Sequence, residues 1–314
     1  MFLDGNRTGD RPPIACVTGA SGMIGGRIVG KLLERGYEVR GLTRGQHLNQ
    51  AVRAFRADLS DEVHLDEFMR GADMVFHCAG ELNDESKMQE VNILGTARIV
   101  DLVRRHQIRY FCHLSSAGVV GRSLQRRVDE ATPCQPQNTY ERTKLEAEKL
   151  AGRQIAGCTT IILRPTNVVD SSHLGELHLA VSGSLKSRVM TIVKGGECAH
   201  MVHALDVAAA ALFFLDRPPS QIPRLFFVSR DDDPQNTVGA LWSLYRAMKA
   251  DRDASVIAPH PHLPVCVPYI LRRMVLRTGN CGNVRYSSER LMSEGFLFSF
   301  GIKDIVANII AERH

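Results

Sequence analysis

Paired cysteines and dense basic runs are both missing from this sequence, and each absence excludes a class of protein. The eight cysteines include no C-x-x-C pair and no spacing typical of metal ligands. We therefore predict no metal site, and we expect Cys16, Cys78 and Cys112, which lie in apolar strand-like runs, to be buried reduced thiols. Lys and Arg number 39 against 34 Asp and Glu, a formal charge of +5. This mild charge argues against a nucleic-acid face and allows a few contacts to an anionic small ligand.

A long uninterrupted apolar segment is also missing. The longest apolar stretch, Leu263–Leu276, contains Pro264 and Pro268 and is interrupted by Arg272 and Arg273, so it cannot span a membrane as a helix. Two interpretations remain for it, a helix packed in a substrate lobe and a peripheral membrane contact, and the first is favoured. The first ten residues are polar, which predicts no secretory signal and a cytoplasmic protein.

What is present is a glycine-rich stretch near the start of the chain, Cys16-Val17-Thr18-Gly19-Ala20-Ser21-Gly22-Met23-Ile24-Gly25. It joins an apolar run typical of a buried strand to apolar residues at helical spacing. Gly19 allows a sharp turn, Gly22 allows the backbone to approach a phosphate, and Gly25 allows the helix to pack on the sheet. The helix start offers N–H groups to a pyrophosphate. The spacing is G-x-x-G-x-x-G rather than G-x-G-x-x-G, and alone it also fits a plain tight turn.

Strands and helices alternate through the first half of the chain, which predicts a parallel, doubly wound α/β sheet with right-handed crossovers. The expected strands are 14–18, 37–43, 73–78, 110–114 and 159–163, and residues 56–59 form the end of another strand that precedes 73–78. The expected helices start at 24, 62 and 139, with a long one carrying Met88, Val91, Gly95, Ile99 and Leu102 on one face.

The alternation loosens beyond Pro165. There we expect a helix over 174–187, a strand over 190–193, a helix over 207–215 and a strand over 224–228. With 314 residues and 44% hydrophobic composition, the chain is long enough for a large domain and a smaller lobe. Residues 1–165, rejoined by 200–230, would form the dinucleotide-binding domain. Residues 166–199 and 231–314 would form a smaller, mostly helical C-terminal substrate lobe.

Three polar residues suit hydride chemistry at a carbonyl or carbinol carbon. Ser116 follows the fifth strand, and Tyr140 and Lys144 share one helix face at i and i+4. A phenol titrates near pH 10, and a nearby ammonium would lower its pKa while a serine hydroxyl holds the substrate oxygen. An isolated Tyr-x-x-x-Lys is more often a surface pair, but this one follows the fifth strand of a dinucleotide-type sheet.

The sequence resembles the extended short-chain dehydrogenase/reductase family, of the NAD-dependent epimerase/dehydratase type. The resemblance runs along nearly the whole chain and is densest in VTGASGMIGG (17–26), ADLSD (57–61), DMVFHCAG (73–80), VNILGT (91–96), HLSSAGVVG (113–121), YERTK (140–144), ILRPTNVV (162–169) and MVHALDVA (201–208). It implies a Rossmann sheet and an NAD(P)-dependent enzyme.

The resemblance also implies roles for individual residues. Ser116, Tyr140 and Lys144 would be the catalytic set, with Tyr140 as the acid/base and Lys144 also on the nicotinamide ribose. Asn92 would be a structural hydrogen-bonding residue. The glycine loop would bind the cofactor together with residues at the strand ends, and the set is Gly19, Gly22, Met23, Ile24, Gly25, Asp58, Leu59, Ala79 and Gly80.

Arg44, at the end of the second strand, bears on the choice of cofactor. An acidic residue at that point would bond the ribose 2′-OH of NAD, whereas a cation suits the 2′-phosphate of NADP. The chain reads Gly41-Leu42-Thr43-Arg44 and has no carboxylate there. The sequence therefore favours NADP over NAD.

The substrate is suggested by the same resemblance. Many relatives with this layout act on nucleotide-diphosphate sugars, and Asn167 matches an asparagine that contacts the diphosphate in them. Such relatives usually carry an arginine before the V-H element, where this chain has Ala199 and His200. We expect reduction of a keto-sugar, with reduction of a hydrophobic steroid- or flavonoid-type carbonyl as the alternative. A non-catalytic dinucleotide sensor is a further alternative, but such a protein would not need the Ser–Tyr–Lys set. The sequence does not decide the oligomeric state, and a homodimer is one possibility.

Overall fold

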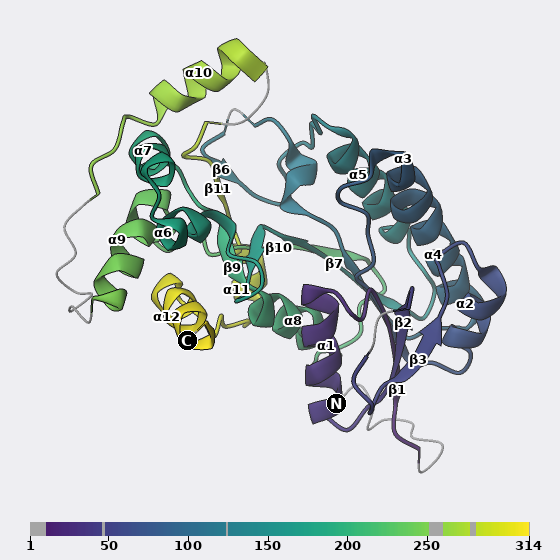
Figure 1. The fold of residues 1–314 in the computed structure, drawn as a ribbon. Coiled ribbons are helices and arrows are strands. Elements are labelled where there is room, and N and C mark those ends of the chain that lie inside the picture. Colours follow the sequence, from purple (N-terminus) through teal and green to yellow (C-terminus); the bar gives the residue numbers. More distant parts are fainter. Residues whose placement is uncertain (1–10, 46–47, 124, 251–259, 277–280, 314) are drawn as a thin grey trace. The chain divides into compact units, whose positions relative to one another are not determined.

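The computed structural model describes residues 11–45, 48–123, 125–250, 260–276 and 281–313 (Figure 1). They fall into two compact units. The first comprises Met1–Val119, Asn138–Arg164 and Val207–Phe226, and the second Val120–Gln137, Pro165–Asp206 and Phe227–His314. Residues 1–10, on which the expectation of no secretory signal rests, lie outside the described residues.

A seven-stranded sheet forms the centre of the first unit, as predicted, in the order β10-β7-β5-β4-β1-β2-β3 (Figure 1). The pairs from β3 across to β7 are parallel. The strand order reverses beside β1, and in open α/β sheets ligands bind at the carboxyl ends of the strands at such a switch point. The strands are β1 (Ile14–Thr18), β2 (Glu38–Thr43), β3 (Arg53–Arg56), β4 (Met74–His77), β5 (Tyr110–Leu114), β7 (Thr159–Pro165) and β10 (Arg224–Val228).

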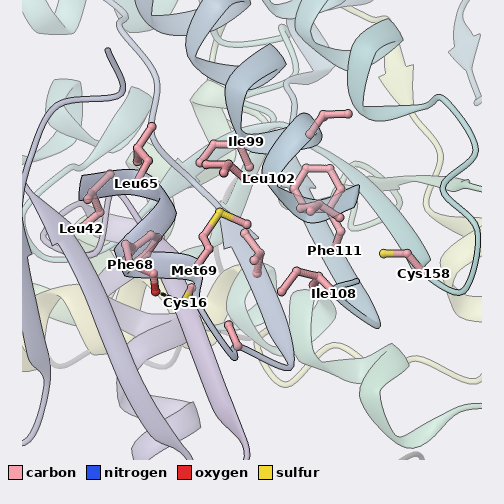
Figure 2. Packing of buried hydrophobic residues seen from close by; sticks show 14 of the residues in the cluster. Cys16, Leu42, Leu65, Phe68, Met69, Ile99, Leu102, Ile108, Phe111 and Cys158 are labelled. Atoms are coloured by element: carbon pink, nitrogen blue, oxygen red, sulfur yellow. Dashed lines mark hydrogen bonds between the residues drawn. The ribbon is translucent and has the colours of Figure 1, made fainter. Parts of the chain in front are cut away.

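Helices cover both faces of this sheet (Figure 1). On one face, a buried cluster joins the sheet to α2, α4 and α5 and includes Phe68, Ile99 and Phe111 (Figure 2). On the other face, the hydroxyl of Tyr110 donates to the carbonyl of Ala211 in α8 at 2.6 Å. The helices of this part of the chain are α1 (Met23–Glu34), α2 (Glu62–Met69), α3 (Glu85–Met88), α4 (Gly95–Arg105), the 3₁₀ turn η2 (Ala117–Val120), α5 (Thr139–Ala151), α8 (Ala204–Phe213) and the 3₁₀ turn η4 (Phe214–Asp216).

The long helix predicted around Val91 is interrupted. A π-helical turn, η1 (Gln89–Leu94), lies between α3 and α4. A π turn holds more residues than an α turn and shifts the side chains that follow, and such turns are frequent at functional sites. Here the turn contains Asn92, whose side chain is buried.

The second unit contains two small parallel sheets, which correct the predicted domain boundaries. In one, β6 (Arg127–Val128) pairs with β11 (Arg285–Tyr286). This pairing joins 120–137 to the second unit, although the sequence analysis assigned these residues to the first domain. In the other, β8 (Asn167–Val169) pairs with β9 (Met201–His203), which keeps 200–206 in the second unit. The stretch that rejoins the first unit is therefore 207–226 rather than 200–230.

The elements of the second unit between 174 and 194 differ from the prediction. The expected helix over 174–187 is broken at Gly183, whose φ is +58°, and the predicted strand over 190–193 is wrong because these residues lie in α7. The side chain of Ser184 caps α7 by accepting from the N–H of Ser187, which starts a new helix there. The helices are η3 (Gly175–Leu177), α6 (His178–Ser182), α7 (Leu185–Lys194), α9 (Val238–Lys249), α10 (Cys266–Leu276), α11 (Glu289–Ser293) and α12 (Ile302–Glu312).

The core of the second unit is formed chiefly by α6, α9, β9 and α12, and it includes Met201, Leu241, Trp242 and Ile305. The helix predicted within Leu263–Leu276 is present as α10, but it is not the fully packed helix that the sequence analysis favoured. Several of its apolar side chains are more than half exposed. Among the described residues, none of the helices has the length and apolar character needed to cross a membrane.

Candidate active site

The glycine loop has the backbone geometry that its sequence requires. Gly19 has a φ of +65°, and a Cβ there would lie 2.8 Å from the backbone nitrogen of Ala79. A Cβ on Gly25 would lie 2.1 Å from the carbonyl oxygen of Gly19. Both positions therefore exclude any side chain, Gly19 by its left-handed backbone and Gly25 by its contact with the turn. The loop fits a group that must approach the backbone closely.

The start of α1 is suited to an anion. Gly22 is the N-cap and supplies no side-chain acceptor, and the first turn contains no acidic residue. The N–H groups of Met23 and Ile24 thus lie at a helix N-terminus that carries partial positive charge. A hollow of about 430 Å³ adjoins this loop, but it includes none of the three predicted catalytic residues; it is lined by Ala20, Ser21, Gly26, Val29, Gly30, Leu33, Leu48 and Asn49.

The residues predicted to meet the adenosine half of a cofactor lie at the ends of β2 and β3. Arg44 is exposed directly after β2. Hydrogen bonds from the N–H groups of Asn83, Asp84 and Leu82 lower the pKa of Glu81, and the charge of Arg44 adds to this effect. This places Arg44 in the electrostatic neighbourhood of the loop after β4.

Asp58 and Leu59 differ in what they can offer a ligand. The carboxylate of Asp58 accepts from the N–H and hydroxyl of Ser60, both at 3.2 Å, and it is only half-buried. The side chain of Leu59 is buried against α4, since a Cβ on Gly95 would lie 2.7 Å from its Cδ1. Leu59 could therefore meet an adenine only through its backbone.

A chain of buried hydrogen bonds runs from β1 through β4 to η1. The N–H of Ala79 donates to Thr18 Oγ1 at 3.2 Å, and Thr18 Oγ1 lies 2.7 Å from His77 Nδ1. His77 Nε2 lies 3.0 Å from Thr96 Oγ1, whose hydroxyl donates to the carbonyl of Asn92. The network thus assigns the proton to Nε2 of His77. Burial lowers the pKa of His77 to about 3, so the ring is neutral.

The side chain of Asn92 continues this chain to the catalytic helix. Its Oδ1 accepts from the N–H of Glu81 at 2.8 Å, and its Nδ2 donates to the Glu81 carbonyl and to Thr143 Oγ1, both at 3.0 Å. The hydroxyl of Thr143 donates to the carbonyl of Tyr140. The predicted structural role of Asn92 is confirmed. Sequence reasoning missed Thr18, His77, Thr96 and Thr143, whose only signal was their place within the matched motifs.

Ser116, Tyr140 and Lys144 are all in the first unit, and Ser116 lies near the start of the helix that carries Tyr140, since a Cβ on Gly118 would lie 3.2 Å from Ser116 Oγ and 3.5 Å from Glu141 Cγ. The Ser116 hydroxyl acts to lower the pKa of Tyr140, and its Oγ accepts from the N–H of Gly118 at 3.1 Å. The helix that carries Tyr140 begins beside Asn138, whose side chain caps it by accepting from the N–H of Glu141. Lys144 is buried one turn later, and its Nζ donates to the carbonyl of Leu114 at 2.5 Å. A Cβ on Gly80 would lie 3.8 Å from this Nζ.

Burial is the largest influence on the pKa values of Tyr140 and Lys144, the two ionisable residues of the predicted catalytic set. It lowers the pKa of Lys144 to about 8, although the charges of Cys78 and Glu148 oppose this shift. It raises the pKa of Tyr140, and the hydrogen bond from Ser116 offsets this only in part. The expectation that Lys144 lowers the phenol pKa is therefore not met here, because the ammonium is directed at the Leu114 carbonyl. Tyr140 is a protonated donor at neutral pH.

A buried ion pair joins α5 to β7 near this site. Arg164 at the end of β7 makes two hydrogen bonds to Glu148, at 2.8 and 2.6 Å. The hydroxyl of Ser115, next to the catalytic serine, donates to the same carboxylate at 2.7 Å. The pair thus fixes the strand end that carries Ser116 to the helix that carries Tyr140 and Lys144.

Comparison with known families agrees with this geometry. Residues 15–228 match the NAD dependent epimerase/dehydratase family. The chain belongs to this family. It is accordingly an NAD(P)-dependent enzyme of the extended short-chain dehydrogenase/reductase type, as the sequence motifs predicted.

Curated relatives of this epimerase/dehydratase include both reductases and epimerases. A ketoreductase of a farnesylated dihydroquinoline oxide from Stigmatella aurantiaca is 29% identical over 65% of this chain and 64% of its own length. A putative UDP-glucose 4-epimerase from Methanocaldococcus jannaschii is 30% identical over 64% of this chain and 72% of its own. A dihydroflavonol 4-reductase from Gerbera hybrida is 27% identical over 96% of this chain and 86% of its own.

Solved structures share the fold along nearly the whole chain. A short-chain dehydrogenase/reductase superfamily protein from Agrobacterium tumefaciens with bound NAD is 22% identical, with a TM-score of 0.73, and covers 96% of this chain and 97% of its own. The Thermus thermophilus UDP-glucose 4-epimerase in complex with NAD is 22% identical, with a TM-score of 0.66 over 95% of this chain and 99% of its own.

In this family member, the predicted substrate residue Asn167 lies in the second unit, on β8. Its Nδ2 lies 3.5 Å from the carbonyl oxygen of Ala199, and a Cβ on Gly175 would lie 2.6 Å from it. His200 has a φ of +55° and lies 2.6 Å from Asp231 through Nδ1. Burial lowers the pKa of His200, but hydrogen bonds to Asp231 and Cys198 outweigh it and raise the pKa to about 10.

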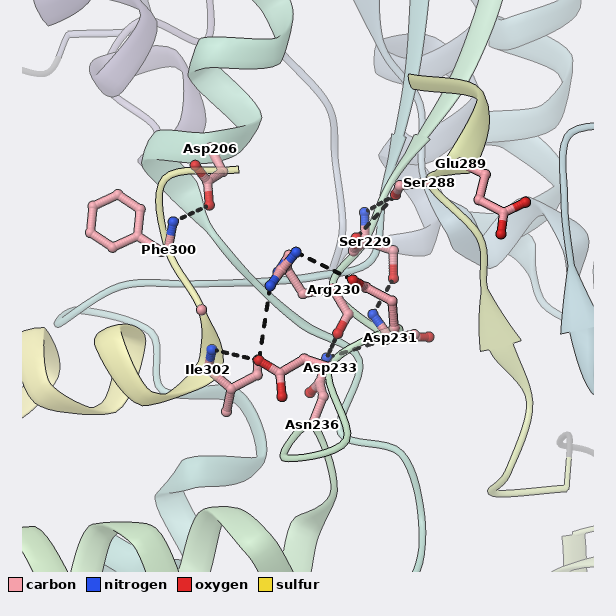
Figure 3. Close-up of polar contacts among 12 residues, drawn as sticks. Asp206, Ser229, Arg230, Asp231, Asp233, Asn236, Ser288, Glu289, Phe300 and Ile302 are labelled. Carbon is pink, nitrogen blue, oxygen red and sulfur yellow. Dashed lines mark hydrogen bonds and ion pairs between the residues drawn. The ribbon is translucent and has the colours of Figure 1, made fainter. Parts of the chain in front are cut away.

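The sequence analysis found no partners for His200, and the structure supplies two. One ligand atom each from Cys198, His200 and Asp231 lies within 4.8 Å of the others. Asp231 is fixed by Asn236, whose Nδ2 donates to its Oδ1 at 3.3 Å (Figure 3), and it also accepts from the N–H of Tyr286. No spacing rule joins residues 31 positions apart, so only the fold could reveal this group. Within this group, the Asp231 carboxylate forms an ion pair with a protonated His200, and its hydrogen bonds to Asn236 and Tyr286 complete its contacts.

Proposed function

We propose that this enzyme transfers a hydride between a nicotinamide cofactor and a ring carbon of a nucleotide-diphosphate sugar, in the direction of keto-sugar reduction. The observation that carries the proposal is that Lys144 is buried one turn after Tyr140 on the helix that begins beside Ser116, in the same unit as the glycine loop. Bound NAD(P)H would supply the hydride. The glycine loop, Asp58, Leu59, Ala79 and Gly80 would hold the cofactor, and Lys144 would bond its nicotinamide ribose.

The chain's own residues would handle the proton. The Tyr140 hydroxyl would donate its proton to the substrate oxygen as the hydride reaches the adjacent carbon. The Ser116 hydroxyl would hold that oxygen in place. The raised pKa of Tyr140 supports a donor role, because burial keeps the phenol protonated at neutral pH.

The nucleotide-sugar substrate is supported by relatives and by one side chain. The Methanocaldococcus jannaschii relative and the Thermus thermophilus structure are both named as UDP-glucose 4-epimerases. Asn167 follows Arg164 at the spacing expected of the diphosphate contact. Arginine is absent before the V-H element, and the protonated His200 at that point is paired with Asp231.

Removing the Asn167 amide tests the substrate class. Asn167→Ala is expected to weaken nucleotide binding by about 1.5–3 kcal/mol, the range for a hydrogen bond to a charged group. Binding of UDP, GDP and dTDP to the cofactor-loaded enzyme would be measured by titration calorimetry for the wild type and the variant. No detectable binding of any of the three nucleotides at millimolar concentration would contradict the assignment of a nucleotide-sugar substrate.

That outcome would favour a second candidate, an NADPH-dependent reductase of a hydrophobic carbonyl. The Stigmatella aurantiaca and Gerbera hybrida relatives are named as reductases of such compounds. Ala199 in place of the usual arginine also suits this candidate. It uses the same Ser116, Tyr140 and Lys144 chemistry, so only the substrate differs.

The cofactor preference is a separate proposal, that Arg44 selects NADP. Arg44→Ala is expected to weaken NADP binding about tenfold or more, because a charged hydrogen bond to the 2′-phosphate is lost, and to leave NAD binding nearly unchanged. Calorimetric titration of both cofactors measures this. Arg105→Ala, which removes an exposed arginine of α4, serves as the control. Equal or tighter binding of NAD than of NADP by the wild type would contradict the assignment.

A further inference from the structure

Helix α10 presents an apolar face that no described residue covers. Ile270 and Leu271 are each 53% exposed, and Met274 and Val275 are 76% and 78% exposed. They form two i, i+4 pairs, so all four lie along one side of the helix. Exposed apolar residues scattered singly are common, but four on one face of an 11-residue helix are a patch.

Helix α7 of the same unit carries a second apolar stripe. Leu185, Val189 and Ile192 are 78%, 51% and 43% exposed, at positions i, i+4 and i+7. The chain that enters α10 packs on the end of α7, because the N–H of Leu263 donates to the carbonyl of Ile192 at 2.9 Å. Helices α7 and α10 therefore neighbour one another (Figure 1).

The sequence in and around these two helices is poor in carboxylates. The sequence contains no Asp or Glu from 177 to 196, nor from 254 to 288. The flanking carboxylates are already paired, Glu176 with Lys194 and Glu197 with Arg272 in a two-bond contact. Lys186 and Arg188 on α7 carry positive charge in addition to these pairs.

We propose that α7 and α10 form a docking surface for an anionic membrane, with both helices lying on the lipid rather than crossing it. Apolar residues beside cations and without carboxylates are the pattern of helices that lie in the headgroup region of anionic lipid. A second copy of the chain is a poorer occupant, because a two-fold contact would bring the same cations together. The docking surface is separate from the proposed chemistry and does not depend on it.

Vesicle co-sedimentation of the full chain tests this surface. The wild type is expected to sediment with phosphatidylcholine vesicles that contain phosphatidylglycerol, far less with phosphatidylcholine alone, and less as salt is raised. Val275→Glu is expected to lower the partition coefficient about tenfold or more, since it removes one apolar contact and adds a repelled charge. Lys186→Gln is expected to lower it about fivefold.

The chain offers a matched control for Val275. Val63 in α2 is also 78% exposed, and Val63→Glu should leave vesicle binding unchanged. A wild type that stays in the supernatant with both vesicle types would overturn the proposal, as would equal loss of binding in the two valine variants. So would a wild type that does not bind vesicles but self-associates, by analytical ultracentrifugation, through contacts that Val275→Glu abolishes.

Discussion

Replacing Tyr140 with phenylalanine is expected to lower turnover about 100-fold or more while leaving the fold and cofactor affinity nearly intact. Burial keeps the phenol of Tyr140 protonated at neutral pH, so loss of its hydroxyl removes the proton donor without opening a cavity. Steady-state kinetics with a carbonyl substrate and reduced cofactor would measure the effect. For the wild type, Tyr140 should stay protonated in mildly alkaline solution because its pKa is raised, so a fall in reduction near pH 8 would report the loss of charge on Lys144, whose pKa is lowered to about 8.

A second tyrosine of the same unit provides the control. Tyr110→Phe removes the buried hydrogen bond to Ala211 and should cost about 1 kcal/mol of unfolding free energy, with turnover almost unchanged. Wild-type turnover by purified Tyr140→Phe would exclude Tyr140 as the acid/base.

Replacing Glu148 with alanine is expected to lower the free energy of unfolding by about 3–5 kcal/mol. The change leaves the guanidinium of Arg164 buried without its carboxylate and removes the acceptor of the Ser115 hydroxyl. Because Ser115 adjoins Ser116, turnover should also fall in the fraction that remains folded. Urea unfolding followed by circular dichroism would measure the stability.

Glu146, two residues earlier on the same helix, offers a matched substitution. It pairs with Lys149, and both side chains are more than half exposed, so Glu146→Ala should change stability by less than about 0.5 kcal/mol. A similar effect of the two glutamate substitutions would show that the Glu148–Arg164 pair does not support the site.

The first half of the fold could be predicted because local pattern and topology agree there. Strand and helix periods alternate from Ile14 to Pro165, and Gly19 and Gly25 are needed for steric reasons that the sequence reveals. The strand-end rule singled out Ser116, which lies just after the end of β5. The π turn at Asn92 did not, because its residues have ordinary helical spacing.

The second half of the fold was predicted less well because long-range contacts determine which of its residues form helices and strands. Residues 190–193 are β-branched in part and resemble a strand, yet the cap at Ser184 and packing on the second core make them helical. The β6–β11 pair joins residues more than 150 positions apart, and Asp231 reaches His200 across 31 positions. The pKa of Tyr140 likewise depended on burial, which sequence spacing does not report.

The division of the first unit into three stretches has a consequence for synthesis of the chain. Residues 207–226 supply α8 and most of β10, the last strand of the sheet. Until they leave the ribosome, β7 is an edge strand with unpaired backbone groups, and Tyr110 lacks the carbonyl that its hydroxyl bonds. Co-translational folding of the dinucleotide-binding unit therefore ends late, after the first two segments of the second unit have been made. Nascent chains stalled before residue 226 should need chaperone protection from aggregation, although every predicted catalytic residue has already been made.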